Sequence, residues 1–149
     1  MLGIIQSFSK QKDIQSIYLG LKDELKEQLI TGLSGSSRAV MIASTYYTQK
    51  KPIMVVTYNL LQAQKLQEDL LQLIPPDEIT LYAGNELIAA ELSIASPELK
   101  AQRIDVLNYW SNHDNGVLIV PISGLRKIIP SKSMWKSLQI PIEVGMDFT

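Results

Sequence analysis

Short apolar runs that alternate with helix-like segments constrain the fold of this chain more than any other feature. Runs of strand length occupy residues 53–56, 79–82 and 117–120, and a weaker one occupies 142–144. Continuous apolar runs of this length are typical of strands in a parallel sheet that is covered on both faces. The alternation of strands and helices predicts βαβ units and therefore an α/β fold with a mainly parallel sheet flanked by helices.

The intervening segments have apolar residues at helical spacing. Prolines disfavour the helical conformation of the residue before them, so Pro52 and Pro75 mark two helix ends. Asn59 is the type of residue that caps a helix, and it precedes a strong leucine stripe. Proline in the first turn suits the start of the last helix, at Pro97. The predicted helices are 13–28, 36–49, 60–73 and 97–111.

The composition excludes several classes of site. The chain of 149 residues contains no cysteine and one histidine, which excludes disulfides, thiolate zinc sites and cysteine nucleophiles. Its formal net charge of −1 gives no overall basic surface for nucleic acid. No apolar run reaches membrane-spanning length and no signal peptide is recognisable, so we expect a soluble, cytoplasmic protein. His113 lies in a turn-like stretch and is expected to face solvent at a helix end.

The segment from Gly32 to Ala39 has the place of a phosphate-binding loop. It follows a short apolar run, Leu29-Ile30, which we interpret as a strand, and it opens the predicted helix 36–49. A working loop needs the pattern G-x-x-x-x-G-K-[ST]. Its backbone amides surround the phosphates, its lysine reaches the β- and γ-phosphates, and its hydroxyl holds magnesium.

Three of the four positions with a defined task are changed in this loop. Gly32 matches the first glycine, whereas Ser37 replaces the second glycine, Arg38 the lysine and Ala39 the hydroxyl. Alanine cannot bind a metal ion, and the planar head of arginine does not reproduce the contact of a lysine. We predict a vestigial loop comprising Gly32, Gly35, Ser37, Arg38 and Ala39, with no catalytic residue, no metal ligand and no cofactor.

Two other interpretations of this loop stay open. It is equally well a glycine-serine turn that opens a helix, with Ser34 or Ser36 as the cap. Alternatively, the N-terminus of the helix and Arg38 still attract an anion.

A basic stretch lies near the C-terminus of the chain. A lysine-rich solvated loop is the commoner outcome for such a stretch, and a DNA contact is the alternative. Two tryptophans stand apart from the loop, and we expect Trp110 in the core and Trp135 partly exposed. The basic residues are Arg126, Lys127, Lys132 and Lys136.

Five segments in one collinear order extend over nearly the whole chain: 27–38 (EQLITGLSGSSR), 58–66 (YNLLQAQKL), 85–91 (NELIAAE), 96–103 (SPELKAQR) and 116–121 (GVLIVP). Together they resemble the N-terminal region of bacterial transcription-repair coupling factors (Mfd). The amino-acid sequence looks closest to the factors of low-GC Gram-positive bacteria. That region is in turn similar to the damage-verifying protein UvrB. The resemblance implies a P-loop-NTPase-like fold, similar to the first domain of UvrB, with a degenerate phosphate loop.

The same resemblance implies a domain organisation. Residues 1–26 would form an N-terminal helical lead, 27–143 the UvrB-like α/β domain, and 144–149 the start of a following, UvrA-binding domain. UvrB-like proteins have an intact phosphate loop and a tyrosine-bearing hairpin. The interval 82–97 is too short for that hairpin and has no tyrosine cluster. We therefore expect the architecture of UvrB without its use of ATP.

Coupling factors displace RNA polymerase stalled at a lesion by ATP-driven translocation on DNA, and they recruit UvrA. The resemblance implies that this chain is a non-catalytic scaffold in such a protein, packed against the rest of it. UvrA would bind mainly through the following domain. RNA polymerase, DNA, ATP and Mg²⁺ would be bound by domains outside this chain. A small nucleotide-binding enzyme with a divergent phosphate loop is the alternative.

Overall fold

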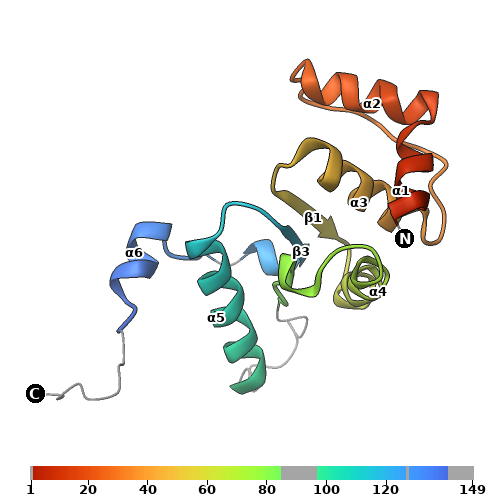
Figure 1. The fold of residues 1–149 in the computed structure, drawn as a ribbon. Helices are drawn as coiled ribbons and strands as arrows, with labels where there is room; N and C mark the ends of the chain where they lie inside the picture. Colours follow the sequence, from red (N-terminus) through yellow and green to blue (C-terminus); the bar gives the residue numbers. More distant parts are fainter. Residues whose placement is uncertain (1, 85–96, 127, 141–149) are drawn as a thin grey trace, which may run out of the picture.

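A three-stranded parallel sheet flanked by helices organises the molecule (Figure 1). The computed structural model describes residues 2–84, 97–126 and 128–140. The predicted α/β class is confirmed. The elements are α1 (Leu2–Ser9), α2 (Lys12–Lys22), α3 (Ser37–Gln49), β1 (Ile53–Thr57), α4 (Leu60–Leu71), η1 (Pro76–Glu78), β2 (Ile79–Leu81), α5 (Pro97–Asn112), β3 (Val117–Pro121), η2 (Gly124–Arg126) and α6 (Lys132–Ser137).

The strands pair in the order β1-β3-β2, so the last strand in the chain lies in the middle of the sheet. Val117 of β3 is in register with Ile53 of β1 on one side and with Ile79 of β2 on the other. The amino ends of all three strands therefore lie together on one side of the sheet, and their carboxyl ends lie together on the opposite side. These strands confirm the three runs predicted from the sequence, while the predicted strand at 142–144 lies outside the described residues.

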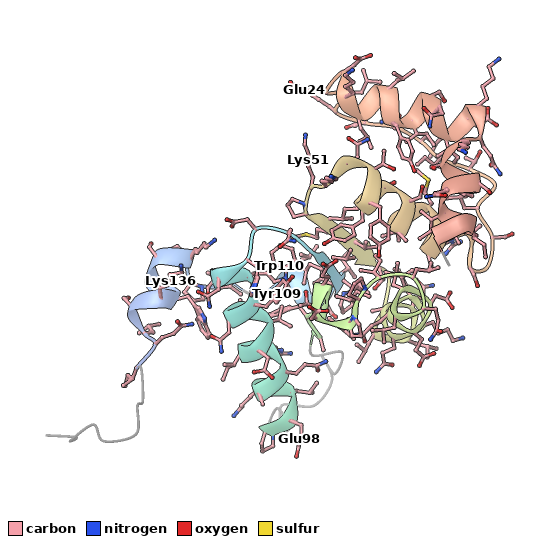
Figure 2. The ribbon with its side chains drawn as sticks, viewed as in Figure 1. Glu24, Lys51, Glu98, Tyr109, Trp110 and Lys136 are labelled. Atoms are coloured by element: carbon pink, nitrogen blue, oxygen red, sulfur yellow. The ribbon has the colours of Figure 1, made fainter. Side chains whose placement is uncertain are left out.

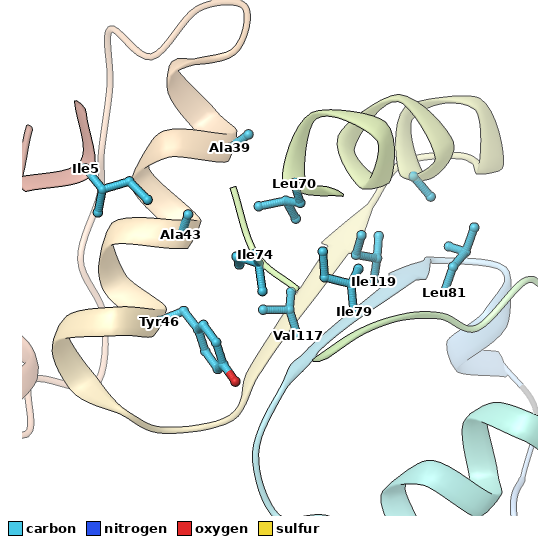
Figure 3. Close-up of a cluster of buried hydrophobic side chains, with 11 residues drawn as sticks. Ile5, Ala39, Ala43, Tyr46, Leu70, Ile74, Ile79, Leu81, Val117 and Ile119 are labelled. Carbon is cyan, nitrogen blue, oxygen red and sulfur yellow. The ribbon is translucent and has the colours of Figure 1, made fainter. Parts of the chain in front are cut away.

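The main core lies between one face of the sheet and the helices α3 and α4 (Figure 3). Leu70 of α4 and Val117 and Ile119 of β3 are fully buried there. Burial of one such side chain stabilises the fold by about 1.5–3 kcal/mol. The buried members are Ile5, Ala39, Ala43, Tyr46, Ala63, Leu70, Ile74, Ile79, Leu81, Val117 and Ile119.

The opposite face of the sheet is covered only in part. α5 approaches it at Trp110, whose Nε1 donates a hydrogen bond to Oγ1 of Thr80 on β2 at 2.9 Å. Trp110 is only half-buried there and belongs to neither core cluster, so the expectation that it lies in the core is not met (Figure 2). On β1, however, Met54 is 59% exposed and Val56 is 50% exposed. The prediction that the run 53–56 is covered on both faces is therefore wrong for the described part of the chain.

The first two helices pack on α3 away from the sheet. Ile5 of α1 joins the main core, and Ile14 and Tyr18 of α2 form a second cluster with Met41. The Tyr18 hydroxyl shares a buried hydrogen bond with Oγ of Ser44 on α3. The segment predicted as a helical lead thus has its own apolar contacts with the α/β body.

Two local predictions are corrected. α2 ends at Lys22 and not at 28, because Glu24 adopts the left-handed conformation (φ 58°) and the Leu25 N–H bonds back to the Gly20 carbonyl oxygen at 2.9 Å. The apolar run Leu29-Ile30 is not a strand, since residues 27–34 form no regular structure and Leu29 is 91% exposed.

The predicted cap of α4 is confirmed. The side-chain oxygen of Asn59 accepts a hydrogen bond from the backbone N–H of Gln62 at 2.9 Å. This bond satisfies one of the amide groups that a helix leaves unpaired at its first turn.

Candidate functional site

The start of α3 lies beside the carboxyl end of β1, where open α/β sheets bind their ligands. A cavity of about 200 Å³ is present at this position. Small-molecule sites usually occupy roughly 300–1,000 Å³, so this cavity is below their range. Arg38 is the charged residue in its lining, which consists of Arg38, Ile42, Val55, Val56, Thr57, Tyr58, Gln62 and Leu66.

The loop that precedes α3 depends on its glycines for its backbone conformation. Gly32 and Gly35 have positive φ angles of 82° and 53°, and a β-carbon at either position would contact nothing within 4 Å. The constraint is therefore conformational and not steric, since positive φ favours glycine. Both glycines suit a turn as well as a phosphate loop.

The serines of the loop bond within the turn. Ser37 donates both its N–H and its hydroxyl to the carbonyl oxygen of Ser34, at 3.2 and 2.6 Å. Ser36 occupies the N-cap position of α3 but makes no side-chain cap bond. The acceptor of both hydrogen bonds from Ser37 is thus the backbone carbonyl oxygen of Ser34 and not a serine hydroxyl.

Ala39 lies on the buried side of α3, where a metal-binding hydroxyl would have no access to a nucleotide. It is 0% exposed and belongs to the main core together with Ala43 and Leu70. Figure 3 shows Ala39 and Ala43 on the side of α3 that faces Leu70. Arg38, one residue earlier and so about 100° round the helix, is exposed. The residues present at this loop therefore do not fit a magnesium-bound nucleotide.

His113 is exposed just beyond the end of α5, as predicted. Its Nδ1 lies 3.0 Å from the carbonyl oxygen of Tyr109, and its ring stacks on the Tyr109 ring with centroids 4.3 Å apart. Both contacts are with the preceding helical turn, which explains the position of the imidazole structurally. In the described part of the chain, no group of three or more acidic, histidine or cysteine side chains is arranged to hold a metal ion.

The basic stretch near the C-terminus is divided between η2 and α6. Arg126 and Lys136 are exposed, whereas Lys132 pairs with Asp114 through an N–O distance of 2.8 Å. Lys127 lies outside the described residues. The hydrogen bond from Lys132 holds the pKa of the exposed Asp114 carboxyl below its ordinary value. Of the described cations of this stretch, Arg126 therefore belongs to η2, while Lys132 and Lys136 belong to α6 near Asp114.

Asn108 of α5 is hydrogen-bonded to α6 and to the segment that follows it. Trp135 and Gln139 both donate hydrogen bonds to Oδ1 of Asn108, at 2.9 and 2.8 Å. Trp135 is half-buried, which confirms the expectation that it is partly exposed.

Sequence reasoning did not single out Thr57, Tyr58 and Gln62, which share the cavity with Arg38. The positions of Thr57 and Tyr58 were open to prediction, because residues at the carboxyl end of a strand in a parallel sheet lie where such sheets bind ligands, and Gln62 is in the first turn of the next helix. The signal was weak because none of the three carries a charge.

No helix in the described ranges combines the length and the apolar character needed to span a membrane.

Comparisons with known proteins identify relatives of the chain. The transcription-repair-coupling factor of Bacillus subtilis is 44% identical over 144 residues, which is 96% of this chain and 12% of the relative. The factor of Staphylococcus aureus is 39% identical over 119 residues, or 80% of this chain and 10% of the relative. That of Staphylococcus haemolyticus is 38% identical over the same length. No solved structure and no family model matches.

The chain is therefore a homologue of one segment of these proteins and spans about an eighth or less of their length. The genera agree with the resemblance to proteins of low-GC Gram-positive bacteria.

Proposed function

We propose that this chain, a homologue of one segment of the transcription-repair-coupling factors, is a structural module that neither binds nor hydrolyses nucleotide. The burial of Ala39 is the observation that carries the proposal. Its methyl group packs in the core at the position where a working loop presents a metal-binding hydroxyl. A nucleotide site without a magnesium ligand loses the charge neutralisation on which phosphoryl transfer depends.

The role proposed for the module is that of a scaffold in a longer protein. That protein would displace RNA polymerase stalled at DNA lesions and recruit UvrA for excision repair, in the cytoplasm. The names of the relatives support a role in transcription-coupled repair. The module would hold the following, UvrA-binding domain in place, while the ATP-driven motor would lie elsewhere in the longer protein.

Calorimetry of the 149-residue chain with ATP and magnesium tests the absence of nucleotide binding. We expect no binding heat, and no rise in the melting temperature, which a ligand bound only by the folded state would cause. Dissociation constants in the micromolar range would overturn the proposal and favour the divergent nucleotide-binding enzyme. An Arg38→Ala variant then reports whether the charge beside the cavity is responsible.

A second variant tests which substitution in the loop prevents nucleotide binding. Ser37→Gly with Arg38→Lys restores two positions of the phosphate-loop pattern and leaves Ala39 in the core. We expect this variant to fold and still not to bind ATP with magnesium, because position 39 cannot present a ligand. Binding by this variant would show that the alanine is not the limiting change.

The scaffold role is tested with UvrA. We expect no tight complex between UvrA and the 149-residue chain alone, and tight binding once the following domain is included. Equal affinities of the two forms for UvrA would contradict the proposed role.

A further inference from the structure

The outer face of β1 is an apolar surface with no cover from the described residues. Met54 and Val56 point to this face and are about half-exposed, whereas the same face of β3 is better covered, with Val120 2% exposed. Side chains alternate between the two faces of a strand, so both exposed residues lie on the face away from α3 and α4. Among the described residues, helices thus cover one face of the sheet, and the other face is uncovered over β1.

A groove of about 300 Å³ follows this open region. It separates α5 from the outer face of β1 and β3, and it continues to the residues after η2. None of its lining residues is charged, so the groove has no cation for a phosphate group. The lining consists of Met54, Tyr82, Val106, Leu107, Trp110, Leu118, Val120, Gly124, Leu125 and Ile129.

The dimensions of a sheet indicate what is missing. Neighbouring strands lie about 4.8 Å apart and a helix with its side chains is about 10 Å wide, so one helix covers about two strands. α5 bonds to β2 through Trp110 and Thr80, which places it over the β2 side of the sheet. On the closed face α4 contacts all three strands and α3 packs beside α4, so this face is covered by two helices. The open face therefore has room for one further helix, over β1.

We propose that an amphipathic helix from the remaining polypeptide of the longer protein packs beside α5, over Met54 and Val56. This inference rests on the proposed placement of the chain within a longer protein. Matched segments make up only 10–12% of the relatives' length, so ample polypeptide is available to supply the helix. A parallel sheet normally has helices on both faces, because its strands are apolar on both.

The uncharged lining determines the chemistry of the occupant. Nucleic acid binds through lysine and arginine contacts to phosphates, and this groove offers none. An apolar helix stripe at positions i, i+3 and i+4 matches the groove. Arg126 is exposed and follows the lining residue Leu125 in sequence, so an acidic residue at the border of that stripe would be favoured.

Thiol labelling tests the proposal directly, because the chain contains no cysteine. Met54→Cys and Leu61→Cys form a matched pair, since both native side chains are 59% exposed. Leu61 lies in the first turn of α4, outside the groove. In the 149-residue chain we expect comparable labelling rates at the two sites. In the full-length protein we expect the rate at Met54→Cys to fall roughly tenfold or more relative to Leu61→Cys, because labelling then requires local opening.

The other outcomes contradict the proposal. If the ratio of the labelling rates at Met54→Cys and Leu61→Cys were the same in the 149-residue chain and in the full-length protein, the remaining polypeptide would leave the face open. Protection of Met54→Cys that grows with the concentration of the 149-residue chain, and persists between full-length molecules, would assign the face to a second copy. Site-specific readout by peptide mass spectrometry keeps cysteines elsewhere in the full-length protein from interfering.

A cross-link identifies the occupant. A benzophenone attached at Met54→Cys in the full-length protein should react within the same molecule, with residues at helical spacing in one segment. Cross-links between molecules, or to residues at alternating spacing, would overturn the assignment to an intramolecular helix. If the chain did bind nucleotide, calorimetry would show it, and the labelling and cross-linking results would not change. A wrong proposed function can therefore be distinguished from a wrong helix assignment.

Discussion

The hydroxyl of Tyr46 on α3 donates a hydrogen bond to Oε2 of Glu78 in η1, across an O–O distance of 2.9 Å. The bond joins the helix that follows the loop to the turn that starts β2. Burial, followed by the contact with Glu78, raises the pKa of Tyr46 well above its ordinary value. The neutral phenol therefore contributes to the stability of the fold.

Tyr46→Phe should lower the free energy of unfolding by about 1–3 kcal/mol, because Glu78 loses a donor at a partly buried position. The wild-type chain should lose stability above about pH 10, where the unfolded state releases a phenol proton that the folded state retains. The stability of the variant should depend less on pH in this range. The dependence that remains should come from Tyr47 and Tyr109, whose pKa values are also raised by burial. Denaturant unfolding at neutral and alkaline pH measures both effects, and an unchanged alkaline slope would contradict this reasoning.

Asn59→Ala should destabilise the chain by about 0.5–2 kcal/mol, since the Gln62 amide loses its capping acceptor. Asn59→Asp retains an acceptor and is the matched control, with a much smaller expected change. Urea denaturation followed by circular dichroism compares them. Equal losses in the two variants would show that the cap bond is not the cause.

Leu70→Ala should cost about 2–5 kcal/mol because it leaves a cavity between α4 and the sheet. Its neighbour Leu71 is exposed on the same helix, so Leu71→Ala should cost about 1 kcal/mol or less. The melting temperatures of the two variants report the difference. Similar melting temperatures would place the packing of α4 in doubt.

Asp114 should titrate below its ordinary range, and Lys132→Met should raise its pKa back towards that range. The folded-state pKa is depressed, so the associated stability is present above the unfolded-state value, about 3.9, and is lost as the pH falls through the folded-state value. Because both groups are largely exposed, added salt should also reduce the shift. Carboxyl NMR titration measures it, and an identical titration in the variant would exclude the ion pair as its cause.

Gly116→Ala should destabilise the chain for two reasons. Its φ angle is 127°, and a β-carbon would lie 2.9 Å from the Tyr109 hydroxyl oxygen and 3.0 Å from the Glu78 carbonyl oxygen. Gly3→Ala is the control, because a β-carbon there contacts nothing within 4 Å and alanine favours the α1 helix. We expect a lower melting temperature for the first variant and an equal or higher one for the second.

Apolar periodicity was sufficient to locate the sheet, because β1, β2 and β3 each consist of a run bounded by turn residues. The same signal was misleading at Leu29-Ile30, where the run is two residues long and the chain remains irregular and exposed. Length separates these cases better than hydrophobicity, since an isolated pair of apolar residues does not reach the usual length of a strand.

Sequence also misjudged Met54 and Val56. An apolar run indicates that both faces of a strand tend to be buried, but it does not indicate which polypeptide segment covers each face. The end of α2 was missed for a local reason, because Glu24 takes a left-handed conformation that usually signals glycine. At the loop, the substitution at position 39 was readable from the sequence, whereas the inward direction of the Ala39 methyl group required the packing of α3 on α4.

The central position of β3 has a consequence for how the chain acquires its structure during synthesis. Among the described strands, β1 and β2 pair only with β3, so each acquires this partner once the ribosome has delivered the residues up to Pro121. Pairings that are so distant in sequence form slowly, because a long loop must close first. The nascent chain therefore presents β1 without its partner strand from Thr57 onward, and β2 as well from Leu81 onward, until β3 is complete at Pro121. A truncation before Val117 would leave a polypeptide with helices but no sheet, and such a product would be a substrate for chaperones and proteases.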